Sequence, residues 1–242
     1  MENEYGIIKA TPSLPVIDLF RVPHEGKTLV VAHPAFGSNT YRNNLGAMSK
    51  EYYHSKELPK ISFRPATTSE SISIVSYDFE TSKKEIFDPR WLQTSYVVRT
   101  QYGVFVNTQE TDESVLKSML NKCEKVNGIY LGKNDFGCAP YESFETGIQN
   151  SSVFCRGGLA RALEHTDEKI AENLRIIASL KFYKRGVNVC GFDEVKKPIL
   201  KVATLYSYRD FDDNGLDVIG SNWDAYYCDG YAFGVCASEK SE

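Results

Sequence analysis

Short apolar runs are separated by turn-forming residues over the first sixty positions, and apolar and polar residues then alternate over 61–64 and 71–79, a rhythm typical of β-strands. The pattern predicts strands over residues 16–22, 27–33, 61–64 and 71–79, with a short helix over 44–53. Two apolar runs on either side of Gly103, within residues 96–106, predict a β-hairpin. We therefore expect the first part of the chain to be built mainly from strands.

Helical periodicity dominates the middle of the chain. Apolar residues recur at helical spacing over 115–123, after Thr111 or Asp112 as the capping residue and before Gly128. The same spacing predicts further helices over 141–148, 158–165 and 168–180, with Thr166 as the cap of the last one. Strand patterns then return over 186–192, 199–208, 216–219 and 231–237.

This order of strands, helices and strands predicts an α+β fold rather than alternating βαβ units. We expect an antiparallel or mixed sheet with a cluster of three to four helices, within residues 111–182, packed against it. No repeat, low-complexity tract or long Gly/Ser linker divides the sequence. The chain is therefore predicted to form a single domain over residues 1–242.

Composition narrows the classes of partner. A hydrophobic fraction of 42% and a charged fraction of 25% are ordinary for a globular protein with a core. The 28 Lys and Arg residues against 32 Asp and Glu give a net charge of −4, which argues against duplex nucleic acid as a partner. The acidic N-terminus lacks a signal-peptide pattern, and no apolar run approaches the roughly 18 residues of a membrane span. We expect a soluble cytoplasmic protein that does not enter a membrane.

Six cysteines lie in the second half of the sequence. Cys190 and Cys236 fall in strand-like apolar runs, where a thiol acts as a small hydrophobic group. No Cys-x-x-Cys pair is present to indicate a structural zinc site. The sequence therefore predicts reduced core thiols, a reducing compartment and no metal centre.

The strongest candidate for chemistry is an anion site in the segment 154–165. Gly157 and Gly158 precede a predicted helix, whose first N–H groups attract phosphate or carboxylate, and Arg156 stands just before them. Arg161 and His165 are four residues apart and could extend the same positive lining. The structural alternative is an ordinary loop, with Arg161 in a surface ion pair and His165 capping the end of the helix.

A second candidate lies between two predicted strands. Arg64 precedes a run of hydroxyl residues that includes Thr67, Thr68 and Ser69. A guanidinium and hydroxyls together suit an oxyanion, because Arg can form two parallel bonds to it. Ser and Thr are also common turn formers that bond to their own backbone, so a plain polar connection explains the same residues.

Other motifs give weaker signals. Asp210 to Gly215 resembles the start of a calcium loop, but Ser221 stands where a bidentate Glu is required, so a hairpin turn at Asn214-Gly215 is expected. Four histidines (His24, His33, His54 and His165) supply bases for a Ser or Cys nucleophile, and no local motif selects one.

These features favour a protein that binds a small phosphate- or carboxylate-bearing ligand and that could be an enzyme. No motif indicates a cofactor. The alternative is a non-catalytic module that binds a protein partner through an aromatic-rich C-terminal surface. Its aromatic residues are Trp223, Tyr226, Tyr227, Tyr231 and Phe233.

Overall fold

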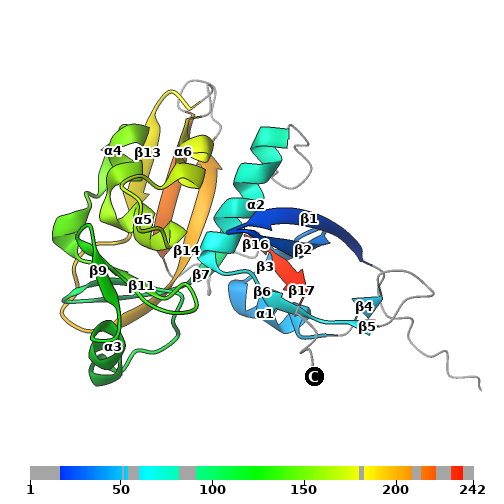
Figure 1. Ribbon diagram of the computed structural model, residues 1–242, viewed down its shortest axis with the longest axis horizontal. Coiled ribbons are helices and arrows are strands. Elements are labelled where there is room, and N and C mark those ends of the chain that lie inside the picture. Colours follow the sequence, from blue (N-terminus) through cyan, green and yellow to red (C-terminus); the bar gives the residue numbers. More distant parts are fainter. Residues whose placement is uncertain are drawn as a thin grey trace, which may run out of the picture.

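The computed structural model describes residues 17–50, 52–53, 60–81, 91–179, 183–208, 214–221 and 230–236. Within these residues the α+β class is confirmed, with mixed and antiparallel sheets and helices packed against them (Figure 1). None of the described helices has the length and apolar character needed to cross a membrane.

The larger sheet carries most of the strands. Neighbouring strands along it are β12 (Gly147–Gln149), β13 (Gly186–Cys190), β15 (Gly215–Ser221), β14 (Ile199–Tyr208), β7 (Leu92–Thr100), β8 (Gly103–Val106), β11 (Gly137–Ala139), β10 (Ile129–Leu131) and β9 (Glu124–Val126). Along this order, β13 and β15 run parallel and the other pairs antiparallel. Strand β16 (Gly230–Ala232) pairs with β7 and with β3 (Phe36–Asn39).

The smaller sheet has the order β1 (Asp18–His24), β2 (Lys27–His33), β17 (Gly234–Cys236) and β6 (Phe63–Pro65). All of its neighbouring strands are antiparallel. A separate short pair is formed by β4 (Tyr52–Tyr53) and β5 (Lys60–Ile61). The C-terminal strand β17 thus joins the two N-terminal strands to β6.

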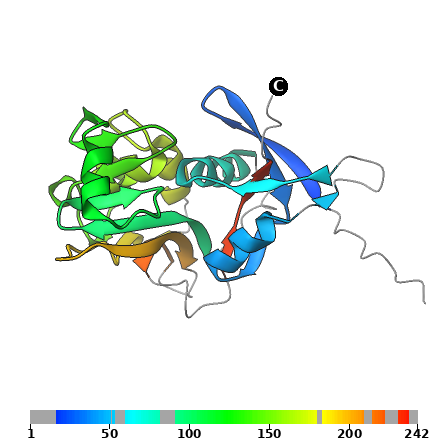
Figure 2. The ribbon, with the colours of Figure 1, turned by 90° about the horizontal axis from the view of Figure 1, so that it is seen from below.

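Helices cover the larger sheet and fill the space between the two sheets. The α-helices are α1 (Tyr41–Met48), α2 (Thr68–Thr81), α3 (Glu113–Leu120), α4 (Ser151–Arg156), α5 (Gly158–Glu164) and α6 (Glu172–Ala178), with a 3-10 turn over Tyr141–Ser143. Helices α4, α5 and α6 lie together on one face of the larger sheet, and α2 lies between them and β1 (Figure 1). Figure 2 shows the larger and smaller sheets on opposite sides of α2.

The expected strand over 71–79 is wrong, because this segment belongs to α2. From Thr68 to Ser76 every side chain is less than a tenth exposed. The alternating Ser and Ile residues are therefore buried on all sides of a helix, rather than divided between a core face and a solvent face. Thr67 and Glu70 supply a capping box at the start of this helix, a signal of the form Thr-x-x-Glu.

Some of the other predicted elements are confirmed and others are wrong. The hairpin of β7 and β8 is confirmed, as is α3 with Asp112 as its cap. The helix expected over 141–148 is wrong: Gly147 has a positive φ of 90°, and the chain there enters β12 after a single 3-10 turn. Helix α6 begins at Glu172 rather than 168.

The largest hydrophobic cluster joins the parts of the fold. It includes Val22 and Val31 from the smaller sheet, Ile72 from α2, Val97 from the larger sheet and Leu159 from α5. These five side chains are at most 1% exposed. A continuous core therefore holds α2 in place, and the elements around α2 position the candidate site.

Candidate functional site

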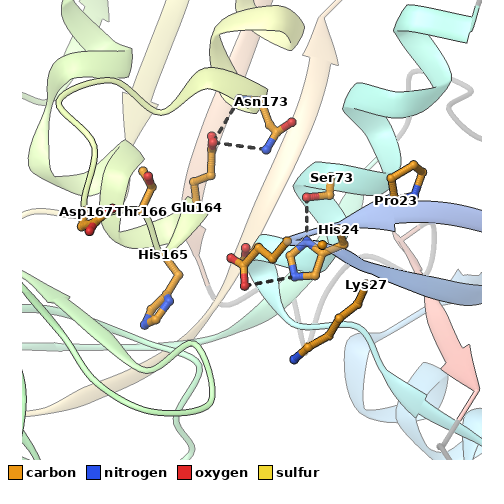
Figure 3. Close-up of a pocket in the computed structure, with 12 residues that line it drawn as sticks. Pro23, His24, Lys27, Ser73, Glu164, His165, Thr166, Asp167 and Asn173 are labelled. Atoms are coloured by element: carbon orange, nitrogen blue, oxygen red, sulfur yellow. Dashed lines mark hydrogen bonds and ion pairs between the residues drawn. The ribbon is translucent and has the colours of Figure 1, made fainter.

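A pocket of about 670 Å³ opens where the β1–β2 hairpin, α2 and the connection from α5 to α6 meet (Figure 3). We call it the His24 pocket. Its lining residues are Pro23, His24, Glu25, Gly26, Lys27, Ser69, Ser73, Glu164, His165, Thr166, Asp167 and Asn173. Most of these side chains are polar or charged, so the pocket suits a polar ligand.

The hairpin supplies one wall. Glu25 and Gly26 form its two-residue turn with φ values of 46° and 72°, which a type I′ turn requires. The turn makes His24 and Lys27 direct partners in the register, so their side chains leave the same face of the hairpin. Val22 lies on that face one step deeper and is fully buried. His24 therefore lies at the edge of the core, between the buried Val22 and the pocket.

Helix α2 supplies the second wall. The Nδ1 atom of His24 lies 2.9 Å from the Oγ atom of Ser73, and both residues are less than a tenth exposed. Ser69 lies one helical turn before Ser73 and faces the same pocket. On the other side of the ring, Nε2 of His24 lies 4.0 Å from a carboxylate oxygen of Glu25.

The third wall is the corner between α5 and α6. His165 ends α5 in the left-handed conformation with φ of 53°, and its Nε2 atom lies 2.9 Å from the carbonyl oxygen of Gly132. Glu164 caps α6 by accepting the N–H groups of Asn173 and Leu174 at 3.0 and 2.9 Å. Burial raises the pKa of Glu164, and these hydrogen bonds offset only part of that effect. In Figure 3 this corner faces the His24 ring.

Asp135 joins the two segments that the sequence singled out. The hydroxyl of Thr67 donates a hydrogen bond to Asp135, and the other oxygen of Asp135 lies 4.0 Å from Nδ1 of His165. Arg64 and Glu70 form a bidentate ion pair, in which both N···O distances are 2.6 Å. Of the second predicted group, Ser69 lines the pocket, whereas Arg64, Thr67 and Thr68 support the start of α2 beside it. Thr68 does so by hydrogen bonds to Ser95 and Asn107.

The residues of the anion site predicted within 154–165 do not lie together in the structure. His165 lines the His24 pocket, and Arg156 is exposed at the end of α4. The N–H group of Gly157 is already bonded to carbonyl groups of α4. A Cβ atom on Gly158 would lie 2.0 Å from Oγ of Ser143, so Ser143 packs directly against this glycine.

Arg161 is a buried structural residue in this arrangement. Its guanidinium donates to the carbonyl oxygens of Arg156 and Asn127 at 3.2 and 2.7 Å. Burial lowers its pKa. These bonds connect α5 to the turn between β9 and β10, and they direct the guanidinium to backbone groups.

The remaining sequence candidates lie partly outside the described residues. The structure does not describe residues 210–213 of the calcium-loop-like motif, nor Trp223, Tyr226 and Tyr227 of the aromatic group. Strands β14 and β15 are antiparallel neighbours, but Tyr208 pairs with Gly215, so Gly215 begins β15 and the expected two-residue turn at Asn214-Gly215 is wrong. Phe233 is 2% exposed and belongs to the core rather than to a surface. Across the described ranges, no group of His, Cys, Asp or Glu residues is arranged to hold a metal ion.

Sequence reasoning missed Ser73 and Lys27, and it named His24 only as one of four histidines. A usable signal was present for the hairpin, because residues two apart in a strand share a face, which places His24 on the same face as Val22. Ser73 could be assigned to the pocket only after its segment was known to be helical.

Comparisons with protein-family models, with curated proteins and with solved structures find no match for this chain. The chemistry of the His24 pocket therefore carries the functional proposal.

Proposed function

We propose that this protein binds a small phosphate- or carboxylate-bearing ligand in the His24 pocket. The observation that carries the proposal is the convergence of Lys27, His24 and His165 on one pocket from the hairpin and the end of α5. Hydroxyl groups of Ser69, Ser73 and Thr166 line the same space. Ammonium, imidazole and hydroxyl groups are donors to the oxygens of an anion.

The lining carries the carboxylates of Glu25, Glu164 and Asp167 against the ammonium of Lys27, so an anion would be held by individual donors rather than by a net positive charge. Glu164 is turned toward the N-terminus of α6, where backbone N–H groups already satisfy its oxygens. Glu25 lies beside the imidazole of His24. Within the described part of the chain, Lys27 forms no ion pair, so its ammonium can meet a ligand directly.

The size of the pocket supports a small molecule. Its volume of about 670 Å³ falls within the roughly 300–1,000 Å³ typical of small-molecule sites. Much of its lining is held by the core: His24, Ser69, Ser73 and Glu164 are all less than a tenth exposed. A ligand would therefore enter a largely preformed site.

A cytoplasmic location is part of the proposal. The five cysteines in the described residues, Cys123, Cys138, Cys155, Cys190 and Cys236, are all free thiols. Free thiols are the usual state of cysteine in a reducing compartment. This supports a protein that folds and works where disulfides do not form.

Thermal unfolding with a panel of anions tests the proposal. Inorganic phosphate, phosphorylated sugars and small organic acids are titrated at constant ionic strength against the wild type, Lys27→Ala and Lys122→Ala. Lys122 is exposed and lies outside the pocket, so its variant controls for the lost charge. A ligand that prefers the folded state raises the melting temperature by mass action.

We expect at least one anion to give a saturable rise in melting temperature. Loss of one charge-assisted hydrogen bond is worth roughly 1.5–3 kcal/mol, so Lys27→Ala should weaken binding by about one to two decades. Lys122→Ala should bind as the wild type does. Equal affinity in both variants, or no saturable rise with any anion, would contradict the proposal.

A further inference from the structure

We propose that Ser73 is a nucleophile for acyl groups and that His24 is its general base. The inference rests on the proposed function in one respect, since it places the reaction in the same pocket. It also specifies the ligand class: an ester whose acyl part leaves the site as a carboxylate. The observations that carry it are the Ser73–His24 contact and its position at the pocket surface.

The contact has the geometry of a nucleophile and its base. The distance of 2.9 Å between Oγ of Ser73 and Nδ1 of His24 is within hydrogen-bond reach. With the ring hydrogen on Nε2, Nδ1 is an acceptor for the hydroxyl hydrogen of Ser73. Both residues line the pocket, which places the pair beside the space that a substrate would occupy.

Glu25 is placed to favour this form of the ring. Its carboxylate lies 4.0 Å from Nε2, on the side of the imidazole away from Ser73. A carboxylate there favours a hydrogen on Nε2 and stabilises the imidazolium that forms when Nδ1 takes a proton. Glu25 is 56% exposed in its side chain, so water weakens this effect and Glu25 acts as a positioning residue.

Lys27 and Ser69 are the groups available for the acyl oxygen. Lys27 leaves the hairpin on the same face as His24, and Ser69 lies one turn before Ser73 on α2. Both line the pocket. Hydrogen-bond donors and cations close to a developing oxyanion stabilise the transition state of acyl transfer.

The reaction balances without any added oxidant or cofactor. Oγ of Ser73 bonds to the ester carbonyl carbon while its hydrogen moves to Nδ1 of His24, and the bond from that carbon to the alcohol oxygen breaks. The alcohol leaves with the proton held by His24. Water then attacks the acyl group and gives a proton to Nδ1, the bond to Ser73 breaks, and Oγ regains its hydrogen. The products are one alcohol and one carboxylic acid.

The other buried serines of α2 show what a purely structural serine is like here. Ser71 and Ser76 are each 1% exposed, their hydroxyls have no hydrogen-bond partner in the described residues, and neither residue lines the pocket. Ser73, in contrast, contacts His24 and lines the pocket. The pair could also fasten the hairpin to α2 without any chemistry, so the test must detect a covalent bond rather than a change in stability.

The test is covalent labelling of the folded full chain with a fluorophosphonate, a reagent for activated serine hydroxyls. The labelled peptide is located by mass spectrometry, and the labelling rate is measured for wild type, Ser73→Ala, His24→Gln and Ser76→Ala. Ser76→Ala is the matched control on the same helix. Turnover of a short-chain 4-nitrophenyl ester is followed in the same four proteins.

We expect the adduct on Ser73, no adduct in Ser73→Ala, and a rate at least about 100-fold lower in His24→Gln, the usual contribution of a general base. Ser76→Ala should react as the wild type does. An adduct absent from the wild-type peptide that contains Ser73, or an unchanged rate in His24→Gln, would overturn the inference. The wild-type peptide map decides the first point even if Ser73→Ala fails to fold.

Failure here and failure of the proposed function give different results. Anion binding without a Ser73 adduct leaves a binding pocket and removes the nucleophile. A Ser73 adduct without any anion-dependent rise in melting temperature leaves the nucleophile and removes the anion site.

Discussion

Thr67 and Glu70 hold each other at the start of α2: a Glu70 carboxylate oxygen accepts the N–H of Thr67 at 2.9 Å, and the Thr67 hydroxyl oxygen accepts the N–H of Glu70 at 3.2 Å. Arg64 binds both carboxylate oxygens of Glu70 from the side. This arrangement fixes the helix that carries Ser69 and Ser73, so the pocket depends on a residue that does not line it.

Replacing Glu70 by Ala should therefore destabilise the fold. The change removes a cap and leaves Arg64 without its carboxylate partner, which we expect to cost on the order of 2 kcal/mol of unfolding free energy. Urea unfolding measures the effect. Glu124→Ala, an exposed position on β9, is the control and should change stability by less than about 0.5 kcal/mol.

Glu70 also predicts a pH dependence. Burial opposes its charge, but the hydrogen bonds from Arg64 and Thr67 outweigh burial and hold its pKa below the ordinary 4.5. The unfolded chain therefore binds a proton at Glu70 more readily than the folded chain does. Its contribution to stability is present above the unfolded pKa and is lost as the pH falls through the folded pKa.

Urea unfolding at several pH values between 7 and 3 tests this sign. The wild type should lose more unfolding free energy on acidification than Glu70→Gln, whose side chain does not titrate. The pH dependence is misassigned if the two proteins lose the same amount.

Close packing at Gly158 gives a third prediction. A Cβ atom there would lie 2.0 Å from Oγ and 2.5 Å from Cβ of Ser143. Gly158→Ala should therefore cost about 1–3 kcal/mol by overpacking. Adding Ser143→Gly to that variant should recover most of the loss.

Gly46→Ala is the control for this pair, because Gly46 lies inside α1 with nothing within 4 Å of its would-be Cβ. It should be neutral or stabilise by about 0.5–1 kcal/mol. If Gly158→Ala were as mild as Gly46→Ala, the close contact between α5 and Ser143 would be wrong.

The cysteines provide a fourth prediction. Burial raises the pKa of Cys138 and of Cys155 to about 12, so both thiols are protonated and unreactive at neutral pH. In the native protein they should resist iodoacetamide. After denaturation without reductant, a thiol assay should count six free groups from the whole sequence. A count of four or fewer would reveal disulfides and exclude the proposed compartment.

Much of the strand content could be predicted from sequence. Residues 199–208 and 96–106 alternate or carry β-branched runs, and both form strands of the larger sheet. Helix α3 was predictable because its apolar spacing and its Asp112 cap agree with each other. Where local signals point to one structure, the fold follows them.

Helix α2 shows why the rest could not be predicted. Its Ser-Ile alternation has the period of a strand, but tertiary packing buries both kinds of side chain. The capping box at Thr67 and Glu70 was the one local signal for a helix. Likewise, the site depends on three segments that are far apart in sequence, and nothing local brings His24 to Ser73, 49 residues away.

Chemical-shift mapping of backbone amides with inorganic phosphate is the most direct test of where the protein binds an anion. We predict saturable shifts confined to residues 23–27, 69–73 and 164–173, which include the lining of the His24 pocket. Shifts centred on Arg156, Gly157 and Gly158 would contradict it and place the anion at the start of α5 instead.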